Sequence, residues 1–171
     1  NNSSKNSQQS SNSENTQTEQ ASGTEQQKTN TTVEKTEQVV GMGQVVKVGD
    51  VEYIVHSKSS ATNVGGDFGK NANGVYLILD VTVKNVGKKA ITVDSNFFTL
   101  FRGDVEYSSD SSAGIYANEA GKFFLSELNP GTEIAGKVVF DVTQEVIDDP
   151  AIQLQVQTGV WGTQKAKINL Q

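Results

Sequence analysis

The stretch Val75–Asn85 reads VYLILDVTVKN and decides the fold of this chain. It is rich in β-branched residues and contains neither glycine nor proline, as is typical of strand interiors. Apolar side chains alternate with more polar ones, which is the pattern of a β-strand with one face in a core. The apolar face consists of Val75, Leu77, Leu79, Val81 and Val83. We therefore expect a central strand that other strands must cover.

The remaining strands follow from apolar alternation between turn signals. Gly49-Asp50 separates two short candidate strands, and glycine at the first position of a two-residue loop fits a type II′ hairpin turn. Asn129–Thr132 has proline and glycine at the central positions of a type II turn. The expected strands besides the central one are Gln44–Val48, Val51–Ser57, Ala90–Val93, Asn96–Phe101, Val105–Tyr107, Thr132–Val142, Ile152–Gln157 and Lys165–Leu170, and Phe123–Leu128 is a short apolar segment. Eight or nine strands at this spacing, with no convincing helix, predict an all-β antiparallel sandwich.

The amino-terminal part of the chain has a different composition. Residues 1–32 contain no large apolar residue, and Ala21 is their only apolar side chain. Such a segment cannot bury enough surface to offset a backbone ordering cost of about 1–2 kcal/mol per residue. We expect residues 1–40 to be a disordered tether and residues 41–171 to be the sandwich. The tether is either a spacer that lifts the domain off a surface or a tail of no consequence.

Charge and cysteine content exclude several classes of function. The net charge is −6, with −2 on residues 1–40 and −4 on the rest, and neither part has a basic patch. Nucleic-acid binding is therefore not expected. Cysteine is absent, which excludes disulfides, a thiolate nucleophile and cysteine-ligated zinc. No apolar run approaches the ~18 residues that a transmembrane helix needs.

Two long polar segments, Lys58–Asn73 and Ser108–Lys122, are expected to be surface loops. Long loops on a rigid sandwich are where function tends to lie. A glycine-rich run lies in the first segment, but a strand follows it, whereas a phosphate cradle precedes a helix. The candidate contacts for a ligand or partner are Asp67, Phe68, Tyr116 and Trp161. Trp161 and Tyr116 each have two interpretations: stacking on a ligand or partner, or packing at the edge of the core.

No catalytic or metal-binding pattern emerges from the sequence. His56 is the only histidine, so a histidine zinc site is excluded, and nothing indicates a catalytic triad around it. None of the acidic runs has the spacing of a calcium-binding loop. We expect no catalytic residue, no cofactor and no metal, and we expect that the protein is not an enzyme.

Two blocks of the sequence resemble a known domain family of unknown function. Gly74–Lys89 is similar to its first signature, and Phe123–Gly131 followed by Gly136–Val142 is similar to its second. The family occurs in lipoproteins of Gram-positive bacteria and is related to a secreted immunoprotective mycobacterial antigen. The resemblance covers residues 44–170 and implies an immunoglobulin-like, telokin-like sandwich. It also implies a lipidated cysteine ahead of Asn1 and an extracellular, membrane-anchored domain, and the start at Asn1 rather than methionine suggests a removed signal peptide. The family has no established catalytic residues to carry over.

These observations together favour a non-catalytic, surface-anchored recognition module that binds a protein or another component of the cell envelope. The alternative is a domain that binds a small ligand or a cell-wall glycan in a pocket near Trp161. We expect a monomer that does not bind nucleic acid and that meets the membrane only through its lipid anchor.

Overall fold

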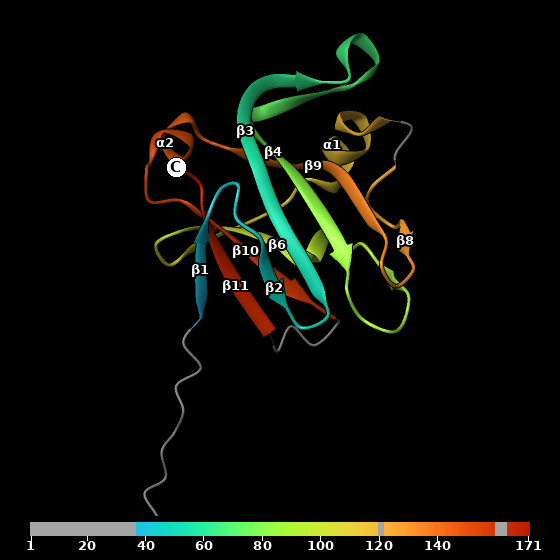
Figure 1. The fold of residues 1–171 in the computed structure, drawn as a ribbon. Coiled ribbons are helices and arrows are strands. Elements are labelled where there is room, and N and C mark those ends of the chain that lie inside the picture. The colour runs from blue at the N-terminus through green and yellow to red at the C-terminus, as the bar shows by residue number, and fades with distance from the viewer. Residues whose placement is uncertain (1–36, 120–121, 160–163) are drawn as a thin grey trace, which may run out of the picture. The chain divides into compact units, whose positions relative to one another are not determined.

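Two β-sheets pack face to face around one apolar core in the computed structural model (Figure 1). The structure describes residues 37–119, 122–159 and 164–171. The first sheet has the strand order β1-β11-β10-β6-β7, with bounds Gln38–Gly41, Gln164–Asn169, Gln153–Thr158, Phe98–Arg102 and Val105–Ser108. The second has the order β2-β3-β4-β9, with bounds Val46–Val48, Val51–Val64, Lys70–Asn85 and Glu133–Val142. A two-stranded ladder joins β5 (Ile91–Thr92) to β8 (Glu127–Leu128). The predicted all-β sandwich is confirmed.

Strand β4 has the central role expected of Val75–Asn85. It pairs antiparallel with β3 on one side and with β9 on the other. Leu77, Leu79, Val81 and Val83 from its inner face are buried in the core between the sheets. Facing them are buried residues of the first sheet, including Leu154, from β10. Alternation along one strand therefore places the core correctly.

Both predicted turns are present. The hairpin between β2 and β3 pairs Val48 with Val51 around Gly49 and Asp50. Gly49 has φ +57° and Asp50 does not have a positive φ, which fits a type II′ turn rather than type I′. In the second turn, the Thr132 amide donates to the Asn129 carbonyl at 3.0 Å, and Gly131 has φ +84°. That φ is the one a type II turn requires at its third residue.

Replacing Gly131 by valine should destabilise the domain through backbone strain alone. A Cβ atom at this position would meet no heavy atom within 4 Å, so steric collision contributes nothing. A β-branched residue at φ +84° is unfavourable, and we expect a loss of about 1–2 kcal/mol, above the ~0.5 kcal/mol of a neutral surface change. The denaturant midpoint of Gly131→Val, compared with that of Gly131→Asn, which tolerates positive φ better, measures this effect. Equal midpoints for wild type and both variants would contradict it.

The segment Lys58–Asn73 is not the surface loop that we expected. β3 continues to Val64 and β4 starts at Lys70, so only Gly65–Gly69 connects them, through the 3₁₀ turn η1 (Gly66–Phe68). The prediction failed because this part of the hairpin has few apolar residues, and Ala61 and Val64 do not have the spacing of two that signals a strand. Its ladder is kept by cross-strand backbone pairs, with register shifts at Val55/Ser57 and Ala61/Asn63.

The expectation of no convincing helix is wrong for the second predicted loop, whereas Thr143–Pro150 was expected to be a loop or a short helical turn. Helix α1 covers Ser111–Ala117, inside the second predicted loop, and α2 covers Gln144–Asp148. A second 3₁₀ turn, η2, covers Ser95–Phe97. Helices this short are unstable alone, and they form because their surroundings fix them.

The ordered sheet starts earlier than the predicted boundary at residue 41. Strand β1 begins at Gln38 and pairs in parallel with β11, matching Val40 with Ile168. The partner lies 128 positions away in the sequence, so no local pattern around Val39 and Val40 announces the strand. Most of the predicted tether, residues 1–36, lies outside the described residues.

Candidate functional site

The two segments expected to be loops meet at one end of the domain. Lys70, at the start of β4, forms a salt bridge with Asp110, just before α1, with 2.8 Å from Nζ to Oδ2. The hairpin also touches α1 directly, because a Cβ atom at Gly65 would lie 2.9 Å from Cβ of Tyr116. Helix α1 in turn adjoins Phe124 and Leu125, so the β3–β4 hairpin end, α1 and the Phe123–Leu128 segment lie together although they are far apart in the sequence. We call this region the α1 end.

Helix α1 forms because the outer face of the second sheet is apolar beneath it. Tyr76 and Ile78, on the face of β4 opposite the main core, are buried together with Val139 of β9 and Ala113 of α1. This is a second, smaller core. The Tyr76 hydroxyl has no hydrogen-bond partner there among the described atoms, and burial raises its pKa. Tyr76 and Ile78 were the sequence signal that a helix or strand must cover this face.

Asp110 fixes the start of α1. Its Oδ1 accepts a hydrogen bond from the Ala113 amide at 2.9 Å, which is the geometry of a helix N-cap. Its backbone amide donates to the Val139 carbonyl at 2.7 Å and so ties the helix to β9. Burial opposes ionisation of Asp110, but the bonds from Lys70 and the Ala113 amide outweigh burial, so the pKa of Asp110 lies below its ordinary value.

The lowered pKa of Asp110 predicts acid sensitivity. A carboxyl whose pKa is lower in the folded than in the unfolded state stabilises the fold above its unfolded value, here near 3.8. This contribution is lost as pH falls through the folded value, so stability should decline below about pH 4. Asp110→Asn keeps the oxygen that caps α1 but removes the charge. We expect it to be less stable than wild type at pH 7 and to lose less stability between pH 5 and pH 2.

Asp104→Asn is the matched control for Asp110→Asn, because Asp104 is exposed and forms no ion pair among the described residues. Urea unfolding at several pH values measures both variants. Parallel pH profiles for wild type and Asp110→Asn would rule out a role for Asp110 in acid sensitivity.

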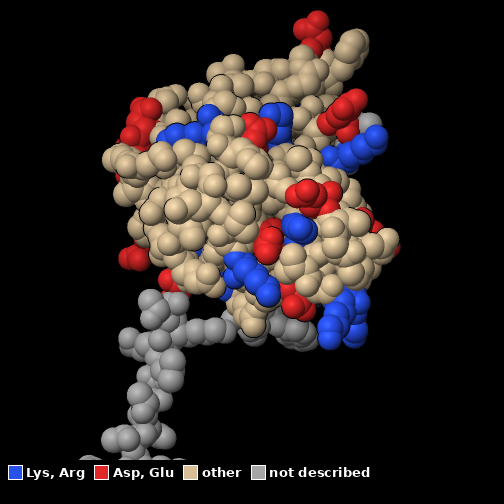
Figure 2. All heavy atoms as spheres, in the orientation of Figure 1, with Lys and Arg blue, Asp and Glu red and all other residues tan. Residues whose placement is uncertain are grey.

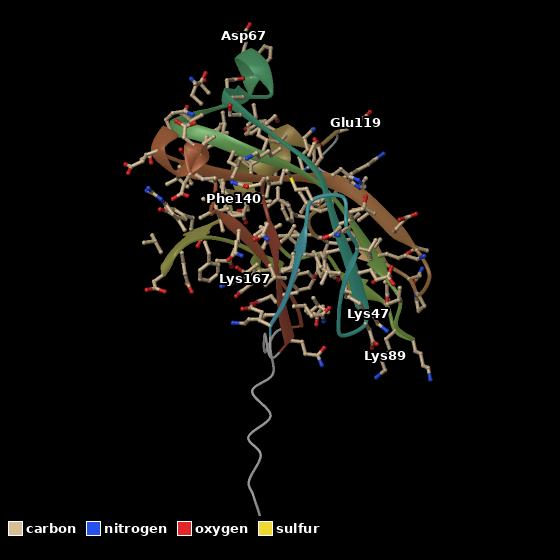
Figure 3. The ribbon with its side chains drawn as sticks, turned by 60° about the vertical axis from the view of Figure 1, so that its left-hand side comes forward. Lys47, Asp67, Lys89, Glu119, Phe140 and Lys167 are labelled. Atoms are coloured by element: carbon tan, nitrogen blue, oxygen red, sulfur yellow. The ribbon has the colours of Figure 1, made fainter. Side chains whose placement is uncertain are left out.

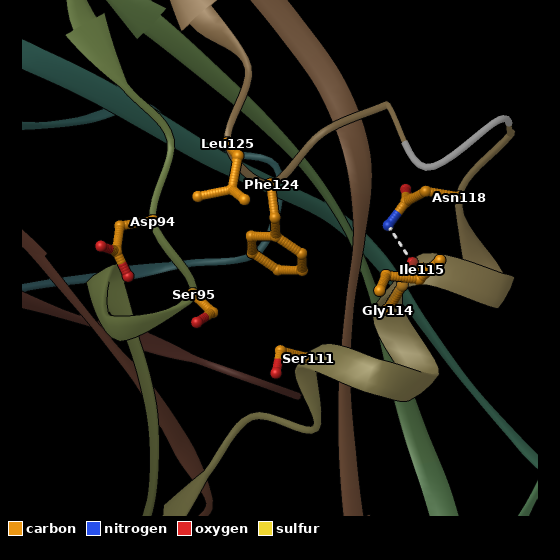
Figure 4. A pocket seen from close by; sticks show the side chains of 8 residues that line it. All are labelled: Asp94, Ser95, Ser111, Gly114, Ile115, Asn118, Phe124 and Leu125. Carbon is orange, nitrogen blue, oxygen red and sulfur yellow. Dashed lines mark hydrogen bonds between the residues drawn. The ribbon is translucent and has the colours of Figure 1, made fainter.

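Asn118, just after α1, occupies the outer edge of strand β9. Its Oδ1 accepts from the Lys137 amide at 2.7 Å, and its Nδ2 donates to the Lys137 carbonyl at 2.9 Å. The same Nδ2 donates to the Gly114 carbonyl at 2.8 Å, which links the strand edge to the helix end (Figure 4). The side chain of Asn118 thus replaces a neighbouring strand at this point of β9.

The hairpin tip carries Asp67 and Phe68 away from the body of the domain (Figures 1 and 3). The Phe68 side chain is 93% exposed. Asn63 fixes the tip: its Oδ1 accepts from the Gly66 amide at 2.9 Å and its Nδ2 donates to Asn71 Oδ1 at 2.8 Å. A large aromatic side chain is therefore held in solvent by an ordered turn. Figure 2 shows mixed charges over this face of the domain and mostly uncharged atoms toward the tip.

A cavity of about 460 Å³ opens beside α1 (Figure 4). Its apolar wall consists of Ile115 from α1 and of Phe124 and Leu125 from the strand-like segment that follows. Leu125 is 81% exposed and is the only non-glycine among the described residues with a positive φ, +64°. This conformation costs energy for leucine and tends to persist at functional positions. The polar rim consists of Asp94, Ser95, Ser111 and Asn118.

The structure brings three of the four candidate residues to the α1 end. Asp67 and Phe68 lie at the hairpin tip, and Tyr116 lies on α1 with its base against Gly65 and its side chain 47% exposed. Trp161 lies outside the described residues. Gly159, two residues before it, lines a second cavity of about 380 Å³ together with Ile91 and Phe97.

Sequence reasoning missed the residues of the cavity beside α1. Phe123, Phe124 and Leu125 are consecutive, and a regular strand cannot bury all three, which was an available signal that one apolar side chain faces outward. Ile115 gave no usable signal because the helix itself was not predicted.

The acidic residues and the histidine do not gather into a metal site in the described part of the chain. No cluster of three or more histidine, aspartate or glutamate side chains has the geometry of a metal site in residues 37–119, 122–159 and 164–171. His56 is exposed, with Nε2 at 2.7 Å from Oγ1 of Thr82. Among the described residues that line the cavity beside α1, no serine hydroxyl is hydrogen-bonded to a side chain that could act as a base.

Comparison with known proteins assigns the chain to a family. The model of a domain of unknown function, DUF4352, matches residues 40–167. The chain belongs to the DUF4352 family. This confirms the resemblance of the two sequence blocks. No curated protein matches the chain.

Solved structures share the fold of this DUF4352 domain at low sequence identity. The YjhA protein of Bacillus subtilis superposes with a TM-score of 0.61 at 17% identity, over 77% of this chain and 99% of that one. YcdA of Bacillus subtilis, a predicted lipoprotein, gives 0.52 at 23% identity over 72% of this chain but only 38% of its own length. The secreted protein MPT63 of Mycobacterium tuberculosis gives 0.53 at 16% identity, over 78% and 97%. The DUF4352 fold therefore occurs in secreted and lipoprotein-type bacterial chains.

Among the helices that the structure describes, none has the length and apolar character required to cross a bilayer.

Proposed function

We propose that this DUF4352 domain is a non-catalytic recognition module of the bacterial cell surface that binds a protein partner through its α1 end. The observation that carries the proposal is the location of the exposed apolar side chains. Among the described residues, four of the seven large hydrophobic side chains that are exposed belong to this end: Phe68, Ile115, Tyr116 and Leu125. Exposed apolar side chains gathered in one region mark interaction sites, whereas isolated ones do not.

The construction of the α1 end also supports binding rather than catalysis. Its exposed groups are mainly apolar and neutral polar side chains, and the carboxylate of Asp110 is engaged with Lys70 and a helix cap. Aromatic residues held on an ordered backbone contribute strongly to binding because little conformational entropy is lost when they bind. Phe68 and Tyr116 have this character.

A cell-surface location agrees with the similarity to a secreted protein and to a predicted lipoprotein. We propose a lipid anchor ahead of Asn1, with the polar residues 1–36 as the spacer. The composition of that segment, rich in serine, asparagine, glutamine and threonine, suits a flexible linker.

Capture from a cell-envelope extract tests the proposal. The immobilised full chain is compared with Phe68→Ser, which removes the exposed ring. The control is Val105→Ser, because Val105 is also exposed and lies at the start of β7, in the other sheet. We expect Phe68→Ser to reduce the captured amount at least tenfold and Val105→Ser to leave it unchanged.

Treatment of the extract distinguishes the nature of the partner. Loss of capture after protease digestion supports a protein partner, whereas loss only after digestion of cell-wall glycan favours the alternative function. If Phe68→Ser, Tyr116→Ser and the double variant all capture as much as wild type, binding through the α1 end is refuted.

A further inference from the structure

We propose that the cavity beside α1 accepts one apolar side chain of the partner protein, and that a positively charged residue adjacent to it in the partner pairs with Asp94. This inference rests on the proposed function and specifies the partner chemistry. It goes beyond that function because it adds a second contact, distinct from the hairpin tip.

The size and lining of the cavity indicate that it accepts an apolar side chain of the partner. A volume of about 460 Å³ accommodates a leucine or phenylalanine side chain. Three apolar side chains, Ile115, Phe124 and Leu125, surround it. Gly114 keeps it open, because a Cβ atom there would lie 2.8 Å from Cε2 of Phe124 and would displace the ring. The exposed Leu125, held at φ +64°, extends this apolar wall into solvent instead of joining the core.

The charge at the rim of the cavity indicates that the partner also carries a cation. Of the cavity-lining residues that the structure describes, Asp94 alone is charged. Its Oδ1 accepts from the Asn96 amide at 2.8 Å, which caps η2. No lysine or arginine in the described ranges forms a salt bridge with it, unlike Asp80, Asp110 and Asp149. A half-buried carboxylate without a cation can therefore receive one from a partner at a modest desolvation cost.

The position of Asp94 determines where the cation of the partner lies relative to its apolar side chain. Figure 4 shows its carboxylate turned away from the Phe124 ring, toward η2. A cation bound there lies beside the apolar cavity and not inside it. Asp94 also lines the second cavity, next to Ile91 and Phe97. A partner segment therefore places its apolar side chain next to Phe124 and its cation toward η2.

Neither residues 1–32 nor the hairpin tip of a second copy suits this cavity. Residues 1–32 contain no large apolar side chain to fill the cavity. The hairpin tip of a second copy offers Phe68, but its neighbour Asp67 would then approach Asp94, and like charges in contact are unfavourable. The net charge of −6 further favours encounter with a basic partner over self-association.

Titration of the ¹⁵N-labelled full chain with short peptides tests the inference. The probe is acetyl-Gly-Leu-Lys-Gly-amide, and the comparison peptides carry glutamate in place of lysine or serine in place of leucine. We expect the probe to shift the amide resonances of Gly114, Ile115 and Leu125 in a saturable manner. The glutamate peptide should bind at least fivefold more weakly, and the serine peptide should produce no saturable shifts.

Two variants separate the two parts of the site without disturbing the fold. Asp94→Asn keeps the oxygen that caps η2 and should bind the lysine and glutamate peptides equally. Leu125→Gly is compatible with φ +64°, so its unfolding midpoint should not fall, while its affinity for the probe should drop at least threefold. Val105→Ser should behave as wild type.

Several outcomes would overturn the inference. Saturable shifts located elsewhere, equal binding of the lysine and glutamate peptides to wild type, or no binding at millimolar probe would each do so. If any of these occurs while envelope capture still depends on Phe68, the cavity inference fails alone and the proposed function stands. If capture does not depend on Phe68 and Tyr116 but the probe binds as expected, the proposal that the partner binds through these two residues fails.

Discussion

Gly136→Ala should destabilise the domain by about 3 kcal/mol, although alanine is normally preferred to glycine within a strand by roughly 0.5–1 kcal/mol. Gly136 lies in β9, and a Cβ atom there would approach Cδ2 of Phe123 to 2.2 Å and Cγ to 2.3 Å. Phe123 is fully buried, and its ring lies 4.9 Å from that of Phe124 and 6.2 Å from that of Phe98. The ring therefore has little room to retreat, and overpacking strain must be taken up by the core.

A double-mutant cycle identifies the source of the strain. Phe123→Ala alone creates a cavity and should itself cost about 3–5 kcal/mol. In that background, Gly136→Ala meets no ring, and only the Cβ of residue 123, at 2.8 Å, remains close, so its cost should be much smaller and the two effects strongly non-additive. Equilibrium urea unfolding of the four proteins gives the coupling energy. Simple additivity would show that the ring and the glycine are independent.

Asn85→Ala is the second substitution expected to have a large effect, also about 3 kcal/mol. Asn85 is fully buried at the end of β4, and its side chain makes three hydrogen bonds. Nδ2 donates to the carbonyls of Lys89 at 2.7 Å and Leu128 at 2.9 Å, and Oδ1 accepts from the Gly87 amide at 2.9 Å. Removal of the amide leaves these backbone groups without their partner, at a cost of about 1–3 kcal/mol for each group that stays buried.

Asn85 also joins two turns, which makes its substitution more than a local loss. Its backbone amide donates to the Thr132 carbonyl at 3.0 Å, and its carbonyl accepts from the Gly131 amide at 2.8 Å. Asn96→Ala is the control, because Asn96 is exposed and its side chain makes no hydrogen bond in the described chain. Thermal unfolding should separate the two variants clearly. Similar midpoints would show that the Asn85 network contributes little.

The main core was predictable from the sequence because it depends on alternation within single strands. Val75–Asn85, the Gly49 hairpin and the Gly131 turn all carry local signals, and all are present. The parallel pairing of β1 with β11 was not predictable, since Val40 and Ile168 are 128 positions apart and nothing local specifies their contact. Long-range pairing is decided by the competition among all strands for the same edges.

The α1 end was predictable only in part. Phe68 and Tyr116 were identified as candidates by their residue types and by the polar segments around them. Their placement at one end depends on the salt bridge of Lys70 with Asp110 and on burial of Tyr76 and Ile78 beneath α1. The exposure of Leu125 depends on a backbone conformation that leucine disfavours, so sequence reasoning does not predict it.

The hydrogen bonds of Asn118 to the edge of β9 affect whether two copies of the domain can pair through their sheets. β9 is the last strand of its sheet, and a bare strand edge is a template on which a second molecule can add its own strand. The Asn118 side chain occupies both backbone groups of Lys137, and the Asp110 amide occupies the Val139 carbonyl. An unprotected edge would promote polymerisation most strongly at the high local concentration of a membrane-anchored protein, the location proposed above. A single asparagine, supplied by the same segment that forms the α1 end, thus protects this edge against pairing with the sheet of a second copy.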